Sequence, residues 1–277
     1  MRISELHRLL IEVAVDTAKW LKSVHEDVSL HEIVGFSGLR DVTRKMDITA
    51  ENMIVNRLTN GNVKALVVCE ESGVIRTSKE PEFIVLVDPL DGSNNYISGI
   101  PYFSVSIAYA KYSHNAKLED LIGGIVVDVD RLKVYHATRG KGAFIDDKVM
   151  EKYKPPGVPM ILGYLNSEAY LVFKKLEEEW GLLKLRSLGS ASLDLVHVAR
   201  GGAEVFADLR AKLRVVDIAG GYVILREMGG KAFTGTGEKL NPPITRVERI
   251  PSIVAYTDEE AEKNYWRIIE VARVYLR

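Results

Sequence analysis

The segment that most constrains this chain is an apolar run, residues 83–87, that ends in two carboxylates. Five consecutive apolar residues without polar alternation predict a strand that is covered on both faces. Asp88 and Asp91 follow, separated by a turn that Pro89 makes rigid, so both can point into one crevice. Two carboxylates that close repel each other unless a proton or a cation lies between them. We therefore expect a cation at the end of this strand.

The composition is that of an ordinary globular protein. The chain has 277 residues, 47% of them hydrophobic, enough for one large domain or two packed halves. Its 37 basic and 38 acidic residues leave a net charge of −1, so no global field would attract nucleic acid or an anionic membrane. No apolar run approaches the roughly 18–20 residues that span a bilayer, and the N-terminus resembles no signal peptide. We expect a cytoplasmic protein without a nucleic-acid or membrane partner, whose single cysteine, Cys69, is buried.

Helical and strand-like patterns alternate along the chain, which predicts a layered α/β architecture. The expected helices cover residues 4–26, 47–58, 167–180, 190–200 and 218–228, and a last one follows a capping box of Thr257 and Glu260. The expected strands cover residues 65–68, 83–87, 103–109, 121–129, 133–137, 143–145, 160–164, 203–207 and 253–256. Residues 28–46 are expected to form a polar loop. Prolines and a glycine within residues 155–159 predict a boundary between two halves, residues 1–154 and 155–277.

Two further acids stand at the ends of predicted elements. Glu70 follows the strand at 65–68, and Asp217 precedes the helix at 218–228. Taken alone, Glu70 would be a solvated loop acid and Asp217 a helix cap, but α/β sheets place ligands in the crevice beyond their strand ends. Together with Asp88 and Asp91 these acids offer the oxygen donors that Mg²⁺ prefers. The six histidines have neither metal-binding spacing nor a cysteine partner, which argues against zinc.

Gly92 and Ser93 come directly after the paired acids. Alone they would form a plain turn, but if the turn opens a short helix, its free N–H groups form a cradle for an anion. A phosphate held there would lie beside the expected cations, in an arrangement that suits in-line attack by a metal-activated water. The sequence therefore favours metal-dependent phosphate chemistry.

Three segments, taken together, resemble the inositol monophosphatase superfamily, particularly its archaeal branch with fructose-1,6-bisphosphatase activity. They are Glu70-Glu71-Ser72, the six residues from Asp88 to Ser93, and the five residues from Val216 to Gly220. The resemblance covers nearly the whole chain and also includes residues 186–191 and 201–204. It implies a sugar-phosphatase fold with alternating α-β-α-β-α layers. The first half would carry most metal ligands and the second half Asp217 and the substrate pocket, as one compact catalytic unit.

The resemblance also implies roles for individual residues. Two or three Mg²⁺ ions would be bound by Glu70, Asp88, the backbone carbonyl of Leu90, Asp91 and Asp217. Ser93, helped by Asp47 and Glu70, would orient and deprotonate the attacking water, while Asp91 and the N–H groups of Gly92 and Ser93 would hold the substrate. The chain departs from the family at two places: Ser93 replaces the usual threonine, and the segment from Thr43 to Asp47 is one residue longer.

The choice of substrate is expected to depend on the cations before Asp217. Arg210 or Arg186 could grip the distal phosphate of fructose 1,6-bisphosphate, because a guanidinium matches phosphate with two parallel hydrogen bonds. By resemblance, Ser190, Ala191 and Asp208 would line the pocket for sugar or inositol hydroxyls. We expect a Mg²⁺-dependent phosphomonoesterase that acts on inositol 1-phosphate, fructose 1,6-bisphosphate or both, and the resemblance implies a homodimer.

Three alternatives remain open. The first is a 3′-phosphoadenosine 5′-phosphate phosphatase of the same superfamily, and the second is a non-catalytic, metal-binding relative. The third is a dinucleotide-binding oxidoreductase, which is the weakest because residues 235–237 lack the rest of the glycine-rich fingerprint.

Overall fold

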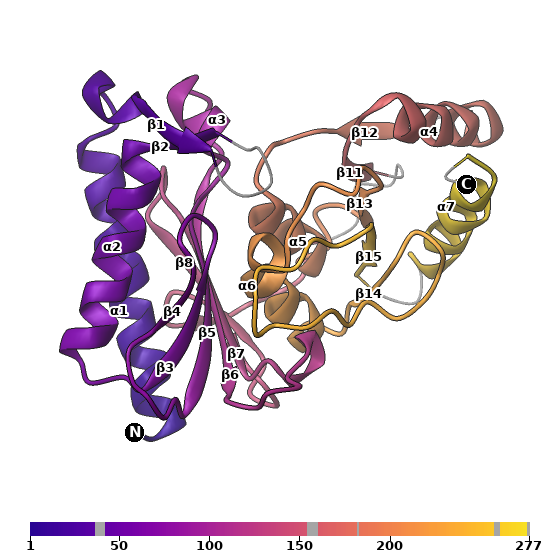
Figure 1. Cartoon of the computed structure of the whole chain (residues 1–277). Helices are drawn as coiled ribbons and strands as arrows, with labels where there is room; N and C mark the ends of the chain where they lie inside the picture. Colours follow the sequence, from indigo (N-terminus) through magenta and orange to yellow (C-terminus); the bar gives the residue numbers. More distant parts are fainter. Residues whose placement is uncertain (37–41, 154–159, 182, 258–260, 276–277) are drawn as a thin grey trace.

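The computed structural model describes residues 1–36, 42–153, 160–181, 183–257 and 261–275, which form five layers (Figure 1). Two helices cover the outer face of an eight-stranded sheet, two more lie between this sheet and a five-stranded sheet, and two cover the far face of the second sheet. The predicted α-β-α-β-α arrangement is therefore confirmed. Three buried apolar clusters hold the layers together: one lies beneath the outer helices of each sheet, and the third surrounds the central helices and reaches both sheets.

The first half is a sheet with helices α1 (Ile3–Ser23) and α2 (Lys45–Asn60) on one face. In α1, Leu6, Leu10, Val13 and Leu21 are buried at helical spacing against this sheet. The sheet has the order β10-β9-β8-β7-β6-β5-β3-β4. Its strands are β3 (Ala65–Cys69), β4 (Gly73–Arg76), β5 (Phe83–Asp91), β6 (Ser104–Lys111), β7 (Gly123–Asp128), β8 (Lys133–Thr138), β9 (Ala143–Ile145) and β10 (Lys148–Val149).

The central layer consists of α5 (Ala191–Ala199) and α6 (Val215–Glu227). Residues 215–225 of α6 are all buried, as expected for a helix with a sheet on each side. A Cβ atom at Gly220 would lie 2.5 Å from Ser106 Oγ on β6 and 3.0 Å from the Ile125 carbonyl oxygen on β7. Glycine at this position therefore lets α6 approach the large sheet closely, and this approach sets where the start of α6 lies relative to the strand ends.

The second half is a sheet of order β12-β11-β13-β15-β14, covered on its outer face by α4 (Ser167–Trp180) and α7 (Glu262–Tyr275). Phe173 of α4 and Ile268 of α7 belong to the apolar cluster beneath these helices. The strands are β11 (Met160–Tyr164), β12 (Lys184–Arg186), β13 (Val205–Asp208), β14 (Lys231–Phe233) and β15 (Ile253–Tyr256).

Several predicted boundaries were wrong in detail. The apolar strand does not end at Val87 but continues as β5 to Asp91. Helices α2 and α6 begin at Lys45 and Val215, so Asp47 and Asp217 lie inside their first turns. The predicted loop at 28–46 instead contains a 3₁₀ helix, η1 (Val28–His31), and two antiparallel strands, β1 (Ile33–Phe36) and β2 (Val42–Arg44). The prolines at 155–159 and Glu260 of the expected capping box lie outside the described residues.

Two smaller points complete the fold. Helix α3 (Ser93–Ile97) is the short helix expected after Gly92, and a second 3₁₀ turn, η2 (Leu118–Asp120), precedes β7. Cys69 is buried as predicted, and burial raises the pKa of its thiol. Within the described residues, no helix combines the length and the apolar character needed to cross a membrane.

Candidate metal and phosphate site

The acids Glu70, Asp88 and Asp91 meet where two neighbouring strands end. Strands β3 and β5 pair in parallel with Cys69 opposite Val87, so the next residues, Glu70 and Asp88, are adjacent. Between Asp88 and Asp91 the pairing of β5 with β6 shifts, because three steps along β5 face two steps along β6. Side chains three positions apart on a regular strand point to opposite faces, and the extra residue brings both carboxylates to the same cavity.

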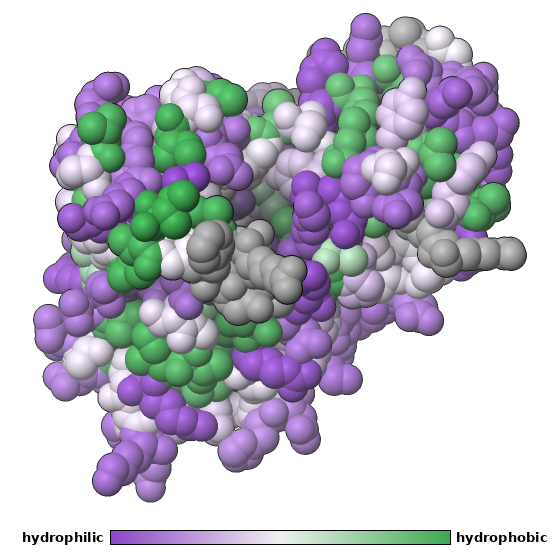
Figure 2. Space-filling model, turned by 45° about the horizontal axis from the view of Figure 1, so that its top comes forward, coloured by the Kyte–Doolittle hydropathy of each residue, from purple (hydrophilic) through white to green (hydrophobic). Residues whose placement is uncertain are grey.

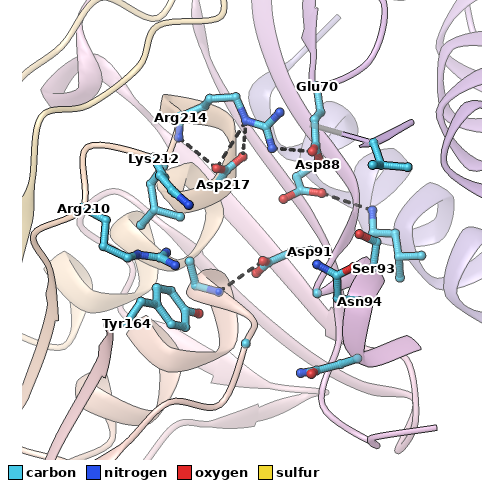
Figure 3. Close-up of a pocket in the computed structure, with 17 residues that line it drawn as sticks. Glu70, Asp88, Asp91, Ser93, Asn94, Tyr164, Arg210, Lys212, Arg214 and Asp217 are labelled. Atoms are coloured by element: carbon cyan, nitrogen blue, oxygen red, sulfur yellow. Dashed lines mark hydrogen bonds and ion pairs between the residues drawn. The ribbon is translucent and has the colours of Figure 1, made fainter. Parts of the chain in front are cut away.

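Asp217 joins this group from the first turn of α6. One carboxylate oxygen each from Glu70, Asp88 and Asp217 lies within 4.8 Å of the other two (Figure 3). The guanidinium of Arg214 lies against the cluster: its Nε is 3.2 Å from Asp217 Oδ1, and its Nη2 donates to Glu70 Oε1. Arg214 was not among the predicted site residues, and its contact with Glu70, 144 residues away, is a product of the fold.

The carboxylate of Asp91 is held by the start of α5. It accepts hydrogen bonds from Ser190 Oγ (2.7 Å), Ala191 N (3.1 Å) and Ser192 N (2.7 Å). These donors are the N-cap and the first N–H groups of the helix, which favour a negative charge. The contact joins the two halves of the chain at the site and fixes one of its acids.

Burial raises the pKa of every carboxyl group in the cluster. The pKa of Asp91 rises to about 8 and that of Asp217 to about 7, and the pKa values of Asp88 and Glu70 are also raised. Removal from water is the largest cause in each case, and for Asp88 the neighbouring negative charges of Glu70, Asp91 and Asp217 add to it. A cation would favour the ionised forms, and a donor set made only of carboxylate oxygens fits a hard ion such as Mg²⁺.

The chain after Asp91 turns sharply into α3. Gly92 has a φ of +97°, and a Cβ there would lie 3.0 Å from the Gly189 carbonyl oxygen and 3.1 Å from that of Tyr102. Only glycine combines this left-handed conformation with such close packing. Asn95 secures the turn, because its Nδ2 donates to the carbonyls of Tyr102 (2.8 Å) and Leu188 (2.7 Å). Ser93 and Asn94 are thereby placed on the rim of the cavity that Asp88 and Asp91 also line.

A cavity of about 470 Å³ lies between the two halves, where the space-filling view shows the surface hollowed (Figure 2). Nine of the predicted site residues line it: Glu70, Asp88, Leu90, Asp91, Gly92, Ser93, Ala191, Arg210 and Asp217. Tyr164, Lys212 and Arg214 line it as well. In Figure 3, Arg210 and Tyr164 lie across the cavity from Ser93 and Asn94. The cavity thus joins an acidic end to a cationic end.

Asp47 lies behind the acidic end and is not among the residues that line the cavity. It is buried, its carboxylate accepts a 3.0 Å hydrogen bond from Arg44 N, and burial raises its pKa to about 7, with a smaller contribution from Glu70. Sequence reasoning missed the neighbouring Glu51, whose carboxylate accepts the backbone N–H groups of Glu71 (3.0 Å) and Ser72 (3.2 Å). Glu51 therefore holds the turn that carries Glu70.

At the cationic end, Arg210 is fixed by two neighbours. Its Nε and Nη2 donate to Asp208 at 3.0 and 2.6 Å, and its guanidinium carbon lies 4.4 Å from the centroid of the Tyr164 ring. The Tyr164 hydroxyl donates in turn to buried Asp194 (2.8 Å). The sequence did not indicate Tyr164 or Asp194, because neither belongs to a motif.

Four predicted site residues do not line the cavity: Asp47, Arg186, Ser190 and Asp208. Arg186 is exposed on β12, where it donates to the carbonyl of Leu185. Ser190 and Asp208 are buried and contact the lining residues Asp91 and Arg210 instead.

Comparisons with known proteins agree with this geometry. Residues 3–272 match the sequence profile described as the inositol monophosphatase family. The chain is 33% identical over 267 residues to an inositol-1-monophosphatase from Aeropyrum pernix, with 92% of this chain and 94% of that protein covered. It is 31% identical over 240 residues to a fructose-1,6-bisphosphatase from Pyrococcus furiosus, with 86% and 88% covered.

A solved structure has the same fold. It is a hypothetical protein from Pyrococcus horikoshii with similarities to inositol-1 monophosphatase, and it superimposes with a TM-score of 0.79 at 26% identity. The match covers 98% of this chain and 99% of that chain. The profile, the relatives and the fold lead to one conclusion: the chain belongs to the inositol monophosphatase family.

Proposed function

We propose that this protein is a Mg²⁺-dependent phosphomonoesterase that hydrolyses inositol 1-phosphate, fructose 1,6-bisphosphate or both. The observation that carries the proposal is the meeting of Glu70, Asp88 and Asp217 within 4.8 Å in a cavity that Ser93 and Arg210 also line. The names of the Aeropyrum and Pyrococcus relatives support the two substrates.

Glu70, Asp88, the carbonyl of Leu90, Asp91 and Asp217 would hold two or three Mg²⁺ ions. All five residues line the cavity, and their oxygen atoms suit a hard cation. Bound Mg²⁺ supplies Lewis acidity, which lowers the pKa of water and stabilises the charge that develops on the phosphoryl oxygens. In this assignment the three hydrogen bonds from α5 to Asp91 keep its carboxylate in a fixed position.

The chain itself would orient the reactants. The N–H groups of Gly92 and Ser93 would donate to the phosphate, which Asp91 helps to position. The Ser93 hydroxyl would accept a proton from the attacking water and pass it toward Glu70, with Asp47 close enough to Glu70 to raise the basicity of the pair. Asp47 acts from behind Glu70 in this assignment, because it does not line the cavity.

The alcohol part of the substrate would extend toward the cationic end. There, Ala191 lines the wall, and Arg210 and Lys212 could bind the second phosphate of a bisphosphate. Asp208 would act by holding Arg210, and Ser190 by holding Asp91. Arg186 is a weaker candidate for the distal phosphate, because it lies outside the cavity lining.

The test is the release of phosphate by the full-length protein with Mg²⁺ and with a chelator. Inositol 1-phosphate, fructose 1,6-bisphosphate and 3′-phosphoadenosine 5′-phosphate should be compared in parallel. We expect Mg²⁺-dependent turnover of one or both of the first two, and Asp147→Asn, an exposed carboxylate outside the site, should leave turnover unchanged. Preference for the nucleotide would favour the related phosphatase, and Mg²⁺ binding without turnover of any ester would favour a non-catalytic protein.

We also propose that the protein is a cytoplasmic homodimer. The family resemblance supports the homodimer, and a sequence in which no apolar run approaches the length that spans a bilayer supports the cytoplasmic location. Sedimentation of the purified protein measures the oligomeric state directly. A monomer at all protein concentrations would contradict the homodimer.

A further inference from the structure

A second cavity, of about 550 Å³, lies at the far end of α6 from the acidic cluster. It is lined by the last turn of α6, by η2, by Arg139 after β8, and by residues from β14 to Lys239. Its volume falls within the range of about 300–1,000 Å³ that small-molecule sites occupy. The wall combines residues from both halves of the chain, so a ligand there would contact each of them.

Two guanidinium groups lie side by side in this second cavity. Arg226 donates to the carbonyls of Glu119 (3.1 Å) and Leu121 (2.8 Å), and Arg139 donates to the same two carbonyls. These carbonyls fix both side chains but carry no net charge. Arg226 also pairs with Glu227, whose Oε1 lies 3.8 Å from its Nε, so one carboxylate offsets part of the repulsion between the two cations. Burial lowers the pKa of Arg226, and Arg139 contributes to the same effect.

The second cavity has more cations than carboxylates among its described residues. Its cations are Arg139, Arg226, Lys231 and Lys239, and its carboxylates are Glu119 and Glu227. Both carboxylates are already engaged: Glu119 pairs with Lys239, and Glu227 pairs with Arg226 (3.8 Å) and accepts the N–H groups of Gly140 (2.8 Å) and Gly142 (3.3 Å). Lys231 makes no ion pair with the described residues, and its Nζ lies 5.9 Å from the centroid of the Tyr256 ring.

The remaining wall is apolar and aromatic. Tyr222, Ala232 and Phe233 line the second cavity beside the cations. Paired arginines match the geometry of a phosphate group, and aromatic side chains offer faces for stacking a planar ring. We propose that the second cavity binds a small molecule in which a phosphate is attached to an aromatic body, the chemistry of a nucleoside monophosphate.

The position of the second cavity relates it to the phosphatase site. Arg226 and Asp217 lie on the same helix, nine residues apart, which is about 14 Å along the helix axis. A ligand in the second cavity would therefore contact the helix that carries one acid of the first site. The binding proposal does not depend on the identity of the phosphatase substrate.

Isothermal titration calorimetry on the full-length protein with Mg²⁺ tests the proposal. The probe is the analogue of adenosine 5′-monophosphate in which a methylene group replaces the bridging oxygen, so that a phosphomonoesterase cannot consume it. Wild type is compared with the double variant Arg139→Gln and Lys231→Gln, which removes one of the paired arginines and the unpaired lysine, both at exposed positions outside the acidic cavity. Lys184→Gln is the matched control, because Lys184 is an exposed lysine on the opposite edge strand of the same sheet.

We expect saturable binding by wild type and by the Lys184 variant, and about tenfold or greater weakening in the double variant, because two charge-assisted contacts are lost. Adenosine, which has no phosphate, should not bind. Absence of binding by wild type would overturn the proposal. Equal affinity in wild type and the double variant would also overturn it, because the probe would then bind outside the second cavity. Equal affinity for inorganic phosphate would overturn the role of the aromatic wall.

Discussion

Arg210 lies over the ring of Tyr164, with its guanidinium carbon 4.4 Å from the centroid of the ring. Asp208 holds the same guanidinium by two hydrogen bonds, and Asp194 holds the Tyr164 hydroxyl. The side chain is therefore fixed before any substrate arrives, which reduces the entropy lost on binding a phosphate.

This arrangement predicts a substrate-specific effect of Arg210→Gln. The variant should lower kcat/KM for fructose 1,6-bisphosphate by about 10- to 100-fold, because a fixed, charge-assisted contact is worth roughly 1.5–3 kcal/mol. Its effect on inositol 1-phosphate should be small, since that substrate has no second phosphate. Steady-state kinetics with both esters measure the difference.

Arg186→Gln is the matched control for this experiment. Arg186 is exposed and lies outside the cavity lining, so its kinetics should resemble those of wild type. If Arg186→Gln lowers kcat/KM for the bisphosphate more than Arg210→Gln does, then Arg186 and not Arg210 binds the distal phosphate.

Asp91 and Ser190 should affect activity to different degrees. Asp91→Asn removes a proposed metal-binding charge and should lower kcat by about a hundredfold or more. Ser190→Ala removes one of three hydrogen bonds to that carboxylate, so it should weaken the apparent affinity for Mg²⁺ more than it lowers kcat at saturating Mg²⁺. Titration of activity with Mg²⁺ separates the two effects, and a loss below about tenfold in Asp91→Asn would count against the metal mechanism.

Removal of Mg²⁺ should reveal the role of Arg214. Its guanidinium contacts both Glu70 and Asp217, so Arg214→Gln should destabilise the chelator-treated protein by about 3 kcal/mol, as for other broken buried ion pairs. Excess Mg²⁺ should recover part of that loss, because it supplies positive charge to the same acids. Urea unfolding with and without Mg²⁺ measures both quantities.

Arg57→Gln serves as the control for Arg214. Arg57 forms an exposed ion pair with Asp16 at 3.3 Å, and such surface pairs contribute about 0–1 kcal/mol. Equal destabilisation by the two substitutions, or no response of the Arg214 variant to Mg²⁺, would contradict the assigned role.

His7 should make the fold sensitive to acid. It lies between Tyr109 and His136, and burial lowers its pKa from 6.5 to about 4. The unfolded chain therefore binds more protons than the native chain between pH 6.5 and 4, so stability should fall as the pH falls through this window. His7→Gln should reduce that fall, while the exposed His114→Gln should not, as measured by urea unfolding at several pH values. Parallel curves for wild type and His7→Gln would contradict this.

Local patterns were sufficient to predict much of the architecture. The apolar run of β5, the spacing of α1 and the acids after β3 and β5 are encoded by neighbouring residues, and the structure confirms these elements. The starts of helices α2 and α6 were misplaced by two and three residues, because acids inside a first turn look like caps. Short edge strands such as β12 and β14, three residues each, were missed because they have too few residues for a period to appear.

The missing parts of the site depend on contacts between distant segments. Ser190 meets Asp91 across 99 positions, and Arg214 meets Glu70 across 144. Tyr164 was read only as the end of a strand, because its role comes from Arg210 and Asp194, which the fold brings to it. Sequence periodicity describes the faces of single elements, and it contains no information on which element packs beside which.

Asp47 and Asp217 occupy the same position in two different helices. Each lies in a first turn and accepts the backbone N–H of the arginine three residues earlier, at 3.0 Å from Arg44 and 2.8 Å from Arg214. Replacement of either aspartate by alanine would therefore remove a helix-starting hydrogen bond together with a charge. Part of any loss of activity in such a variant would then come from a loss of folded protein. Asparagine retains an acceptor oxygen at the same distance, so only the amide variants report on chemistry alone. In the proposed mechanism the same carboxylate at each position both starts a helix and takes part in the reaction, so a substitution there changes stability and activity together.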